Sequence, residues 1–130
     1  MRFIGNILWM IFGGLESALA YFIASLVMAL TIVGIPFAMQ TLKIGVFTLI
    51  PFGSKVVPEP TVFKPLAIIM NIIWIVIAGF WISIMHLVFG VVLSITIIGL
   101  PFGIQHFKLA KIALVPFGKR ILNKDLSYEQ

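Results

Sequence analysis

The stretch GIPFAMQ at residues 34–40 returns as GLPFGIQ at residues 99–105. It belongs to a longer duplication, because residues 6–56 align with residues 71–121 without a gap, and 16 of the 51 aligned positions are identical. Most of the other pairs exchange one apolar residue for another. Self-similarity at a fixed spacing indicates that the structural unit is a repeat of about 50 residues.

The composition is typical of a membrane protein. Hydrophobic residues make up 62% of the chain and charged residues 10%, whereas soluble domains average ~45–50% and ~25%. No Lys, Arg, Asp or Glu occurs between Pro65 and Phe107, and Glu16 is the only one between Phe3 and Leu42. About 18 uncharged apolar residues suggest a membrane-spanning helix. We therefore expect an integral membrane protein.

Other classes of protein fit the sequence less well. Arg2, an apolar stretch and Ala18-Leu19-Ala20 imitate a signal peptide, but the equivalent segment from Asn71 lies deep inside the chain. The chain contains no cysteine, which excludes disulfides and thiol chemistry. The net charge of +5 comes from residues that flank apolar segments, so we expect membrane lipids, and no nucleic acid, as partners.

Each repeat is predicted to have three parts. The long apolar segment, Asn6–Val33 or Asn71–Ile98, should be helical, because a backbone in lipid must satisfy its own hydrogen bonds. A Gly-x-Pro break follows, and then comes a shorter segment with a polar stripe. The predicted fold is all-α: two tandem repeats, each a long transmembrane helical segment, the Gly-x-Pro break and a short amphipathic interfacial helix.

The domain boundaries follow from the repeat. Ser54–Pro65 is rich in proline and charge, and we expect a stiff, exposed linker there. Lys119–Gln130 should be polar and mobile. The predicted divisions are a first repeat at 6–56, a linker with the start of the second hydrophobic segment at 57–70, a second repeat at 71–121 and a polar tail at 122–130.

The topology is open between two alternatives. If each long segment crosses once, the repeats are inverted and the side that carries both termini holds six of the nine basic residues. The alternative is a hairpin in each repeat, turning near Gly13-Gly14 and Gly79, which would place all nine basic residues on the cytoplasmic side. Its first arm, Phe3–Phe12, would span only about 15 Å. Both alternatives make the protein multi-pass with cytoplasmic termini.

Two ionisable residues lie inside the long segments. Glu16 either lines a cation path or carries a proton, or else the helix bends at Gly13-Gly14 and Glu16 caps a helix start near the headgroups. Trp81 occupies the equivalent position in the second repeat, so the two repeats do not share any role of Glu16. His86 is either a titrating group in a pore or a neutral ring bonded across a helix interface. We expect His106 to lie beside lipid headgroups.

Other residues are assigned by type and spacing. The amides either line a polar path or make interhelical and surface contacts, and the tryptophans should mark the membrane interfaces. The pore-lining or polar-lining candidates are Glu16, His86, Gln40, Gln105, Asn6 and Asn71. Small residues spaced by four predict close helix packing at Gly14, Ala18, Gly79, Ser83, Gly90 and Ser94. Lysines of the short segments should meet lipid headgroups, namely Lys43, Lys108 and Lys111.

Catalytic machinery is not visible in the sequence. The four acidic residues are scattered, and no His, Cys or carboxylate pair has the spacing of metal ligands. We expect no enzyme activity, no catalytic residue, no metal and no cofactor.

The repeated motif Asn-Ile-x-Trp, Gly, Gly-[Ile/Leu]-Pro-Phe-x-x-Gln and Pro-Phe-Gly resembles the YccF family of bacterial inner-membrane proteins. The resemblance covers residues 6–121. It implies a small multi-pass protein of the inner membrane, with no known activity or functional residue to carry over. Members of that family often lie beside a larger membrane protein of the exporter type, which implies an accessory role.

Two functional hypotheses follow, both for a homo-oligomer. The first is a channel or transport-related pore for ions or small solutes, with Glu16, His86 and the glutamines as its lining. The second is a non-conducting structural or accessory subunit of a larger membrane transporter, docked through its small-residue faces.

Overall fold

The computed structural model describes residues 2–60 and 63–123. The first repeat consists of α1 (Arg2–Trp9), a π-helical turn η1 (Met10–Gly14), α2 (Leu15–Ala29), α3 (Ile35–Leu49) and strand β1 (Ser54–Pro58). The second consists of α4 (Lys64–Trp74), η2 (Ile75–Gly79), α5 (Phe80–Ser94), α6 (Leu100–Leu114) and β2 (Lys119–Asn123). The predicted helical repeats are confirmed. By length and composition, two segments could cross a membrane: Arg2–Ala29 and Lys64–Ser94, with mean hydropathies of 1.7 and 2.3.

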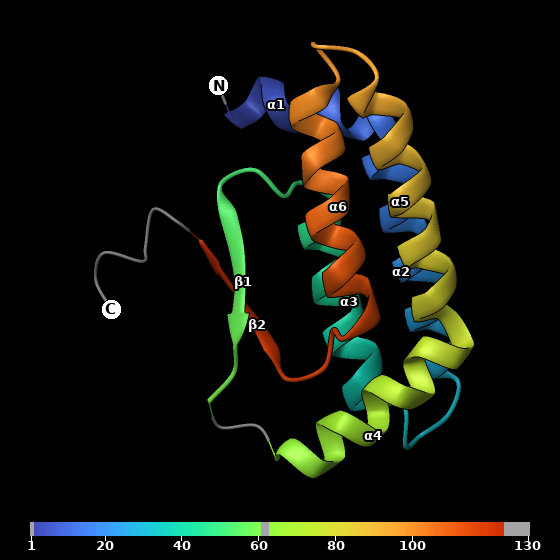
Figure 1. Cartoon of the computed structure of the whole chain (residues 1–130). Coiled ribbons are helices and arrows are strands. Elements are labelled where there is room, and N and C mark those ends of the chain that lie inside the picture. The colour runs from blue at the N-terminus through green and yellow to red at the C-terminus, as the bar shows by residue number, and fades with distance from the viewer. Residues whose placement is uncertain (1, 61–62, 124–130) are drawn as a thin grey trace.

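Both long segments are bent rather than straight. In η1 the backbone leaves helical geometry at Phe12 (φ −94°, ψ 32°) and at Gly13 (φ 109°), where the positive φ favours glycine. As a result α1 and α2 run in different directions. α4 and α5 also run in different directions on either side of η2 (Figure 1), although Gly79 does not have a positive φ. The helix expected over Asn6–Val33 therefore bends near its start, and it ends at Ala29.

Each repeat folds into a helical hairpin. α2 packs antiparallel to α3, and α5 packs antiparallel to α6 (Figure 1). Thr31 closes the first turn, since its hydroxyl donates to the Met28 carbonyl (2.8 Å) and accepts from the Gly34 N–H (3.1 Å). A proline then occupies the first turn of α3, where its missing N–H is not needed. The two hairpin turns lie at opposite ends of the molecule, and a lipid-interface position for α3 and α6 stays a prediction.

A two-stranded ribbon joins the repeats, which corrects two expectations. β1 pairs antiparallel with β2, and Val56 faces Ile121, its equivalent in the second repeat. Because equivalent residues face each other, a local twofold relates the two repeats. The exposed linker expected at Ser54–Pro65 and the mobile tail expected at Lys119–Gln130 each contribute a paired strand instead. Residues 124–130 of that tail lie outside the described residues.

The elements form three layers. The ribbon lies on one side, α3 and α6 pack beside it, and α2 and α5 form the layer farthest from it (Figure 1). α1 and α4 lie at opposite ends, and each leads from the ribbon side towards the α2–α5 layer. The ribbon and the outer helices therefore define two different sides of the molecule.

Candidate functional site

The repeated asparagine closes each repeat on itself. The Asn6 side-chain amide donates to the carbonyl of Phe52 (3.2 Å) and accepts from the N–H of the same residue (3.0 Å). Asn71 makes the same two bonds with Phe117, at 3.1 and 2.9 Å. The start of each repeat is thus tied to the Pro-Phe-Gly turn near its end. These bonds account for both asparagines through folding alone.

The repeated tryptophan has a similar role. Trp9 donates its indole N–H to the Thr48 carbonyl (2.6 Å), and Trp74 donates to the Ala113 carbonyl (2.7 Å). A Cβ at Gly14 would overlap the Trp9 ring, which explains the glycine five positions later. Both tryptophans are buried, so the expectation that they mark a membrane interface is wrong for these two.

A histidine pair lies inside the second hairpin. His86 on α5 and His106 on α6 are both fully buried, and their Nδ1 atoms are 2.9 Å apart. This is the geometry of a hydrogen bond across a helix interface, as one hypothesis for His86 proposed. The expectation that His106 lies beside lipid headgroups is wrong, because α6 packs on α5 and turns this side chain inward.

The pair also contacts the first repeat at its bend. His106 Nε2 lies 2.8 Å from the carbonyl of Phe12. A Cβ at Gly13 would lie 2.9 Å from the same nitrogen, so the bend glycine makes room for the ring. The Trp9 ring centroid is 4.1 Å from that of His106, and the Phe89 centroid is 5.2 Å away. His106 thus forms a contact between the repeats, and the rings of Trp9 and Phe89 pack against it.

The hydrogen bonds determine the tautomers of two neutral rings. Since a carbonyl can only accept, His106 donates from Nε2 to Phe12 and its Nδ1 is an acceptor. His86 must then donate from Nδ1, which leaves a lone pair on its Nε2. That nitrogen is buried without a hydrogen-bond partner among the described residues. A proton added at His86 Nε2 would create a buried charge without a hydrogen-bond partner, which is costly, so we expect the pair to stay neutral.

The first hairpin has hydroxyl groups in the corresponding place. Tyr21 and Thr41 occupy the positions of His86 and His106. The Thr41 hydroxyl is 2.6 Å from the hydroxyl of Ser25 on α2. The two hairpins therefore differ chemically, because both histidines of the chain lie in the second.

Glu16 is exposed on the first turn of α2, directly after the bend. One of the two hypotheses for Glu16 placed it at the start of a helix after a bend at Gly13-Gly14, and this is where it lies. A negative charge at a helix start interacts favourably with the helix dipole. Its counterpart Trp81 is 64% exposed. Gln40 lies elsewhere, because it donates to the carbonyls of Pro116 (3.0 Å) and Lys119 (2.8 Å) beside the ribbon. Glu16 and Gln40 therefore do not line a common polar path within one chain.

The small residues pack within one chain. Ser83 donates to the Ala110 carbonyl (3.0 Å) and so joins α5 to α6, while Gly90 leaves room for the ring of Phe107. The residues expected to pack are all buried or half-buried in the described chain: Gly14, Ala18, Gly79, Ser83, Gly90 and Ser94. Contacts of the same kind between subunits stay a prediction.

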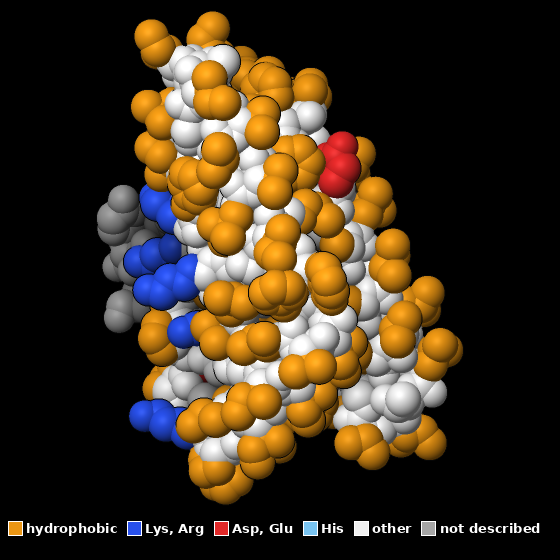
Figure 2. All heavy atoms as spheres, turned by 45° about the vertical axis from the view of Figure 1, so that its right-hand side comes forward, with side chains coloured by type: hydrophobic (Ala, Val, Ile, Leu, Met, Phe, Trp, Pro, Cys, Tyr) orange, Lys and Arg blue, Asp and Glu red, His pale blue; other side chains and the backbone are white. Residues whose placement is uncertain are grey.

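Basic side chains gather on one side of the molecule. Figure 2 shows Lys and Arg side chains along one edge, while most of the remaining surface in that view is hydrophobic. The basic residues of α3, α6 and the ribbon are Lys43, Lys55, Lys108, Lys111, Lys119 and Arg120. The three expected headgroup lysines are exposed. Gln105 is half-buried here, beside Lys108 in a cavity of about 230 Å³.

His106 was the residue that sequence reasoning missed as a partner of His86. A signal was present, because both histidines lie ten residues from Thr96, which is in the turn between α5 and α6. In an antiparallel hairpin, positions equally distant from the turn lie at the same height. The expectation of a separate surface helix concealed this relation.

Comparisons with known proteins agree with the repeat. The YccF family, described as an inner membrane component domain, matches residues 4–54 and 69–119. The chain is 31% identical over 131 residues to the inner membrane protein YccF of Escherichia coli (strain K12), covering 95% of this chain and 88% of that protein. The Shigella flexneri protein of the same name gives the same values. No solved structure matches the chain.

Proposed function

Because this chain belongs to the YccF family of inner-membrane proteins, we propose that it is a non-conducting, non-catalytic accessory subunit that assembles with other membrane proteins and with copies of itself. One observation carries the proposal: polar side chains such as Asn6, Asn71 and Gln40 bond to the chain's own backbone, whereas apolar side chains cover the surface. Such a surface requires lipid or protein contacts.

The apolar surface is extensive. Ile32 and Ile97, at the two hairpin turns, are 86% and 91% exposed. The most apolar windows of the two long segments are only 33% and 28% buried, whereas a core helix of a soluble protein would be mostly buried. In a membrane, such helices associate by close packing and interhelical hydrogen bonds.

The proposed placement keeps the ribbon at the cytoplasmic membrane surface. α1 begins at Arg2 and α4 begins at Lys64, and both lead from the ribbon side towards α2 and α5 (Figure 1). Positive charge would then remain on one side, as the positive-inside rule prefers. As in the hairpin alternative, all the basic residues would lie on the cytoplasmic side with both termini. The chain reverses at residues 30–34 and 95–99, however, and not near Gly13-Gly14 and Gly79, where that alternative placed its turns.

Helix length favours the same placement. α2, α3, α5 and α6 have 15 residues each, or about 22 Å, against a hydrocarbon thickness of ~30 Å. If the hairpins stood across the bilayer, the charged ribbon would lie at mid-depth, where Lys or Arg is costly. With the ribbon at the headgroups, the hairpins lie within the apolar layer and the charges stay in water.

Glu16 indicates where a second subunit docks. It is exposed on α2, in the layer farthest from the ribbon. A carboxylate that faces hydrocarbon costs a few kcal/mol, and a basic or hydrogen-bond-donating side chain of another subunit would remove that cost. We therefore assign the α2–α5 layer as the assembly surface.

Cross-linking in the membrane tests this assembly. A photoreactive residue in place of Val91, which is 57% exposed on α5, should yield products of more than one chain. The same residue in place of Lys55, on the ribbon, is the matched control and should not. Glu16→Gln should reduce the α5 product. A monomer in mild detergent that also gives no product from Val91 would refute the assembly role.

The second candidate is the homo-oligomeric pathway for ions or small solutes. The observation that favours it is again Glu16, since copies that met at α2 would bring several carboxylates together. Ion flux into proteoliposomes tests it: Glu16→Gln should abolish a cation flux, while Glu59→Gln, the same charge change beside the ribbon, should not. The accessory role predicts no flux above that of empty vesicles.

A further inference from the structure

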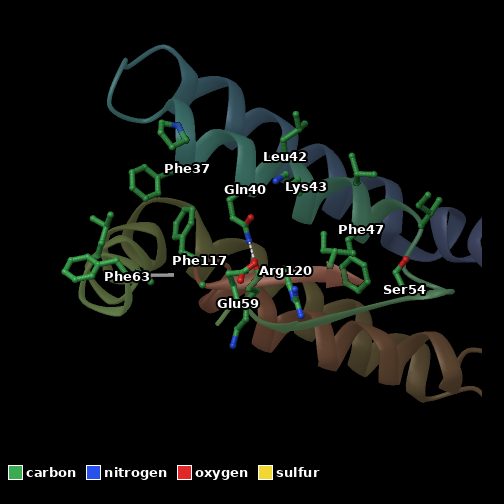
Figure 3. Close-up of a pocket in the computed structure, with 18 residues that line it drawn as sticks. Phe37, Gln40, Leu42, Lys43, Phe47, Ser54, Glu59, Phe63, Phe117 and Arg120 are labelled. Carbon is green, nitrogen blue, oxygen red and sulfur yellow. Dashed lines mark hydrogen bonds between the residues drawn. The ribbon is translucent and has the colours of Figure 1, made fainter. Parts of the chain in front are cut away.

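We propose that a groove between α3, the ribbon and the start of α4 binds one anionic phospholipid. The phosphate would lie at Lys43, Lys119 and Arg120, with an acyl chain along apolar side chains of α3 and α4 (Figure 3). This goes beyond the accessory role. It rests on the proposed placement only because that placement opens the groove at the headgroups.

The groove has the size and the apolar wall that a lipid requires. Its volume is about 790 Å³, within the ~300–1,000 Å³ typical of ligand sites. Figure 3 shows Phe37, Phe63 and Phe117 gathered towards one end. Phe63 is 69% exposed and Leu66 is 46% exposed. An acyl chain on these side chains would cover apolar surface that the chain itself leaves open.

The charge of the groove complements a phosphate. Among the described lining residues, three cations stand against one carboxylate, Glu59. An Arg guanidinium can donate two parallel hydrogen bonds to a phosphate, and such charge-assisted bonds are the stronger kind. Gln40 bonds to the carbonyls of Pro116 and Lys119, so this part of the wall is held in place before a ligand arrives.

The local twofold provides an internal comparison. The counterpart cavity is lined by Gln105, Lys108 and Lys55, which are equivalent to Gln40, Lys43 and Arg120 of the groove. Its volume is only about 230 Å³, and α1 does not line it as α4 lines the larger groove. Lys111 also stands at the position of the groove residue Val46. The lipid is therefore expected in one groove only.

Native mass spectrometry of the full chain in a mild non-ionic detergent tests the proposal. The probes are a phosphatidylglycerol, a phosphatidylcholine with the same acyl chains, and glycerol 3-phosphate. One phosphatidylglycerol should stay bound per chain, while the other two should not. Lys119→Gln with Arg120→Gln should weaken binding roughly 25-fold, about five-fold for each cation. The matched pair Lys55→Gln with Lys108→Gln should leave it unchanged.

A second variant tests the apolar part without a change in charge. Val46→Trp should fill the groove and weaken phosphatidylglycerol binding, whereas Val91→Trp on α5 should not. If Val46→Trp fails to fold, the comparison of the two double charge variants still tests the lipid site. Equal retention of both lipids, equal loss from both charge pairs, or equally strong binding of glycerol 3-phosphate would each overturn the lipid site. Cross-links from Val91 that persist in the groove variants would show that only the lipid site had failed.

Discussion

Trp9 and Trp74 each donate to a backbone carbonyl in the last turn of α3 or α6, where helical carbonyls lack a partner within the helix. Asn6 and Asn71 bond in the same way to the Pro-Phe-Gly turns. In a buried apolar setting, such groups are costly to leave unpaired. At the residue scale, the repeated motif is therefore explained by closure of the hairpins, and it needs no ligand.

Replacing the indole tests this use of the motif. Trp9→Phe keeps most of the ring volume but leaves the Thr48 carbonyl unpaired, so the free energy of unfolding should fall by about 1–3 kcal/mol. Thermal unfolding of the purified protein in detergent measures the change. Trp81→Phe is the matched control, because Trp81 is 64% exposed. Equal losses from both variants would contradict the assigned bond.

The histidine pair makes a spectroscopic prediction. In the neutral pair, His106 should carry its proton on Nε2 and His86 on Nδ1, because the Phe12 carbonyl accepts from His106. Long-range ¹H–¹⁵N correlation spectra of the imidazoles distinguish the two tautomers. A His106 ring that carries its proton on Nδ1 would exclude the bond to Phe12 and, with it, this contact between the repeats.

At the element scale, the long apolar helices and the repeat were predictable, because their hydrophobicity and duplication are properties of continuous sequence. The ribbon was not, since each five-residue strand finds its partner in the other repeat, and such pairing leaves no local pattern. The position of His106 was predicted wrongly for a related reason. The polar stripe suggested that its helix lies at the lipid surface, and the sequence did not show that this helix packs against α5.

The bend in η1 depends on its glycine. Gly13→Ala should destabilise the protein by at least ~1–2 kcal/mol, the cost of a left-handed conformation for an L-residue. The new Cβ would also displace His106. Gly5→Ala is the control, because its Cβ would meet only the Phe52 ring at 3.4 Å or beyond. Unchanged thermal stability of Gly13→Ala would show that the bend has another geometry.

The ribbon can be tested by a disulfide. Val56 faces Ile121, and facing Cα atoms in antiparallel strands are ~4.5–5.5 Å apart, which suits a disulfide. The chain has no cysteine of its own, so Val56→Cys with Ile121→Cys should form one internal bond on mild oxidation. Faster migration of the oxidised protein on a non-reducing gel reports it. Ser54→Cys with Lys119→Cys, at opposite ends of the ribbon, should stay reduced.

At the scale of the whole molecule, the twofold-related repeats place charge on one side and apolar surface on the others. Counting basic residues had left two topologies open, because a count does not show that Arg2, Lys64 and the ribbon lie towards one side. The structure adds that information. Membrane placement from the cytoplasmic side, assembly through α2 and α5, and a lipid at the ribbon groove all depend on this separation.

Cysteine accessibility in oriented membrane vesicles tests that separation most directly. Single cysteines at Lys55→Cys, Ile32→Cys and Ile97→Cys report on the ribbon and on the two hairpin turns. With a membrane-impermeant maleimide, Lys55→Cys should react only from the cytoplasmic face, and both turn positions should stay unreactive from either face. Reaction of Ile32→Cys and Ile97→Cys from opposite faces would instead show hairpins that cross the bilayer, and it would contradict the one-sided placement.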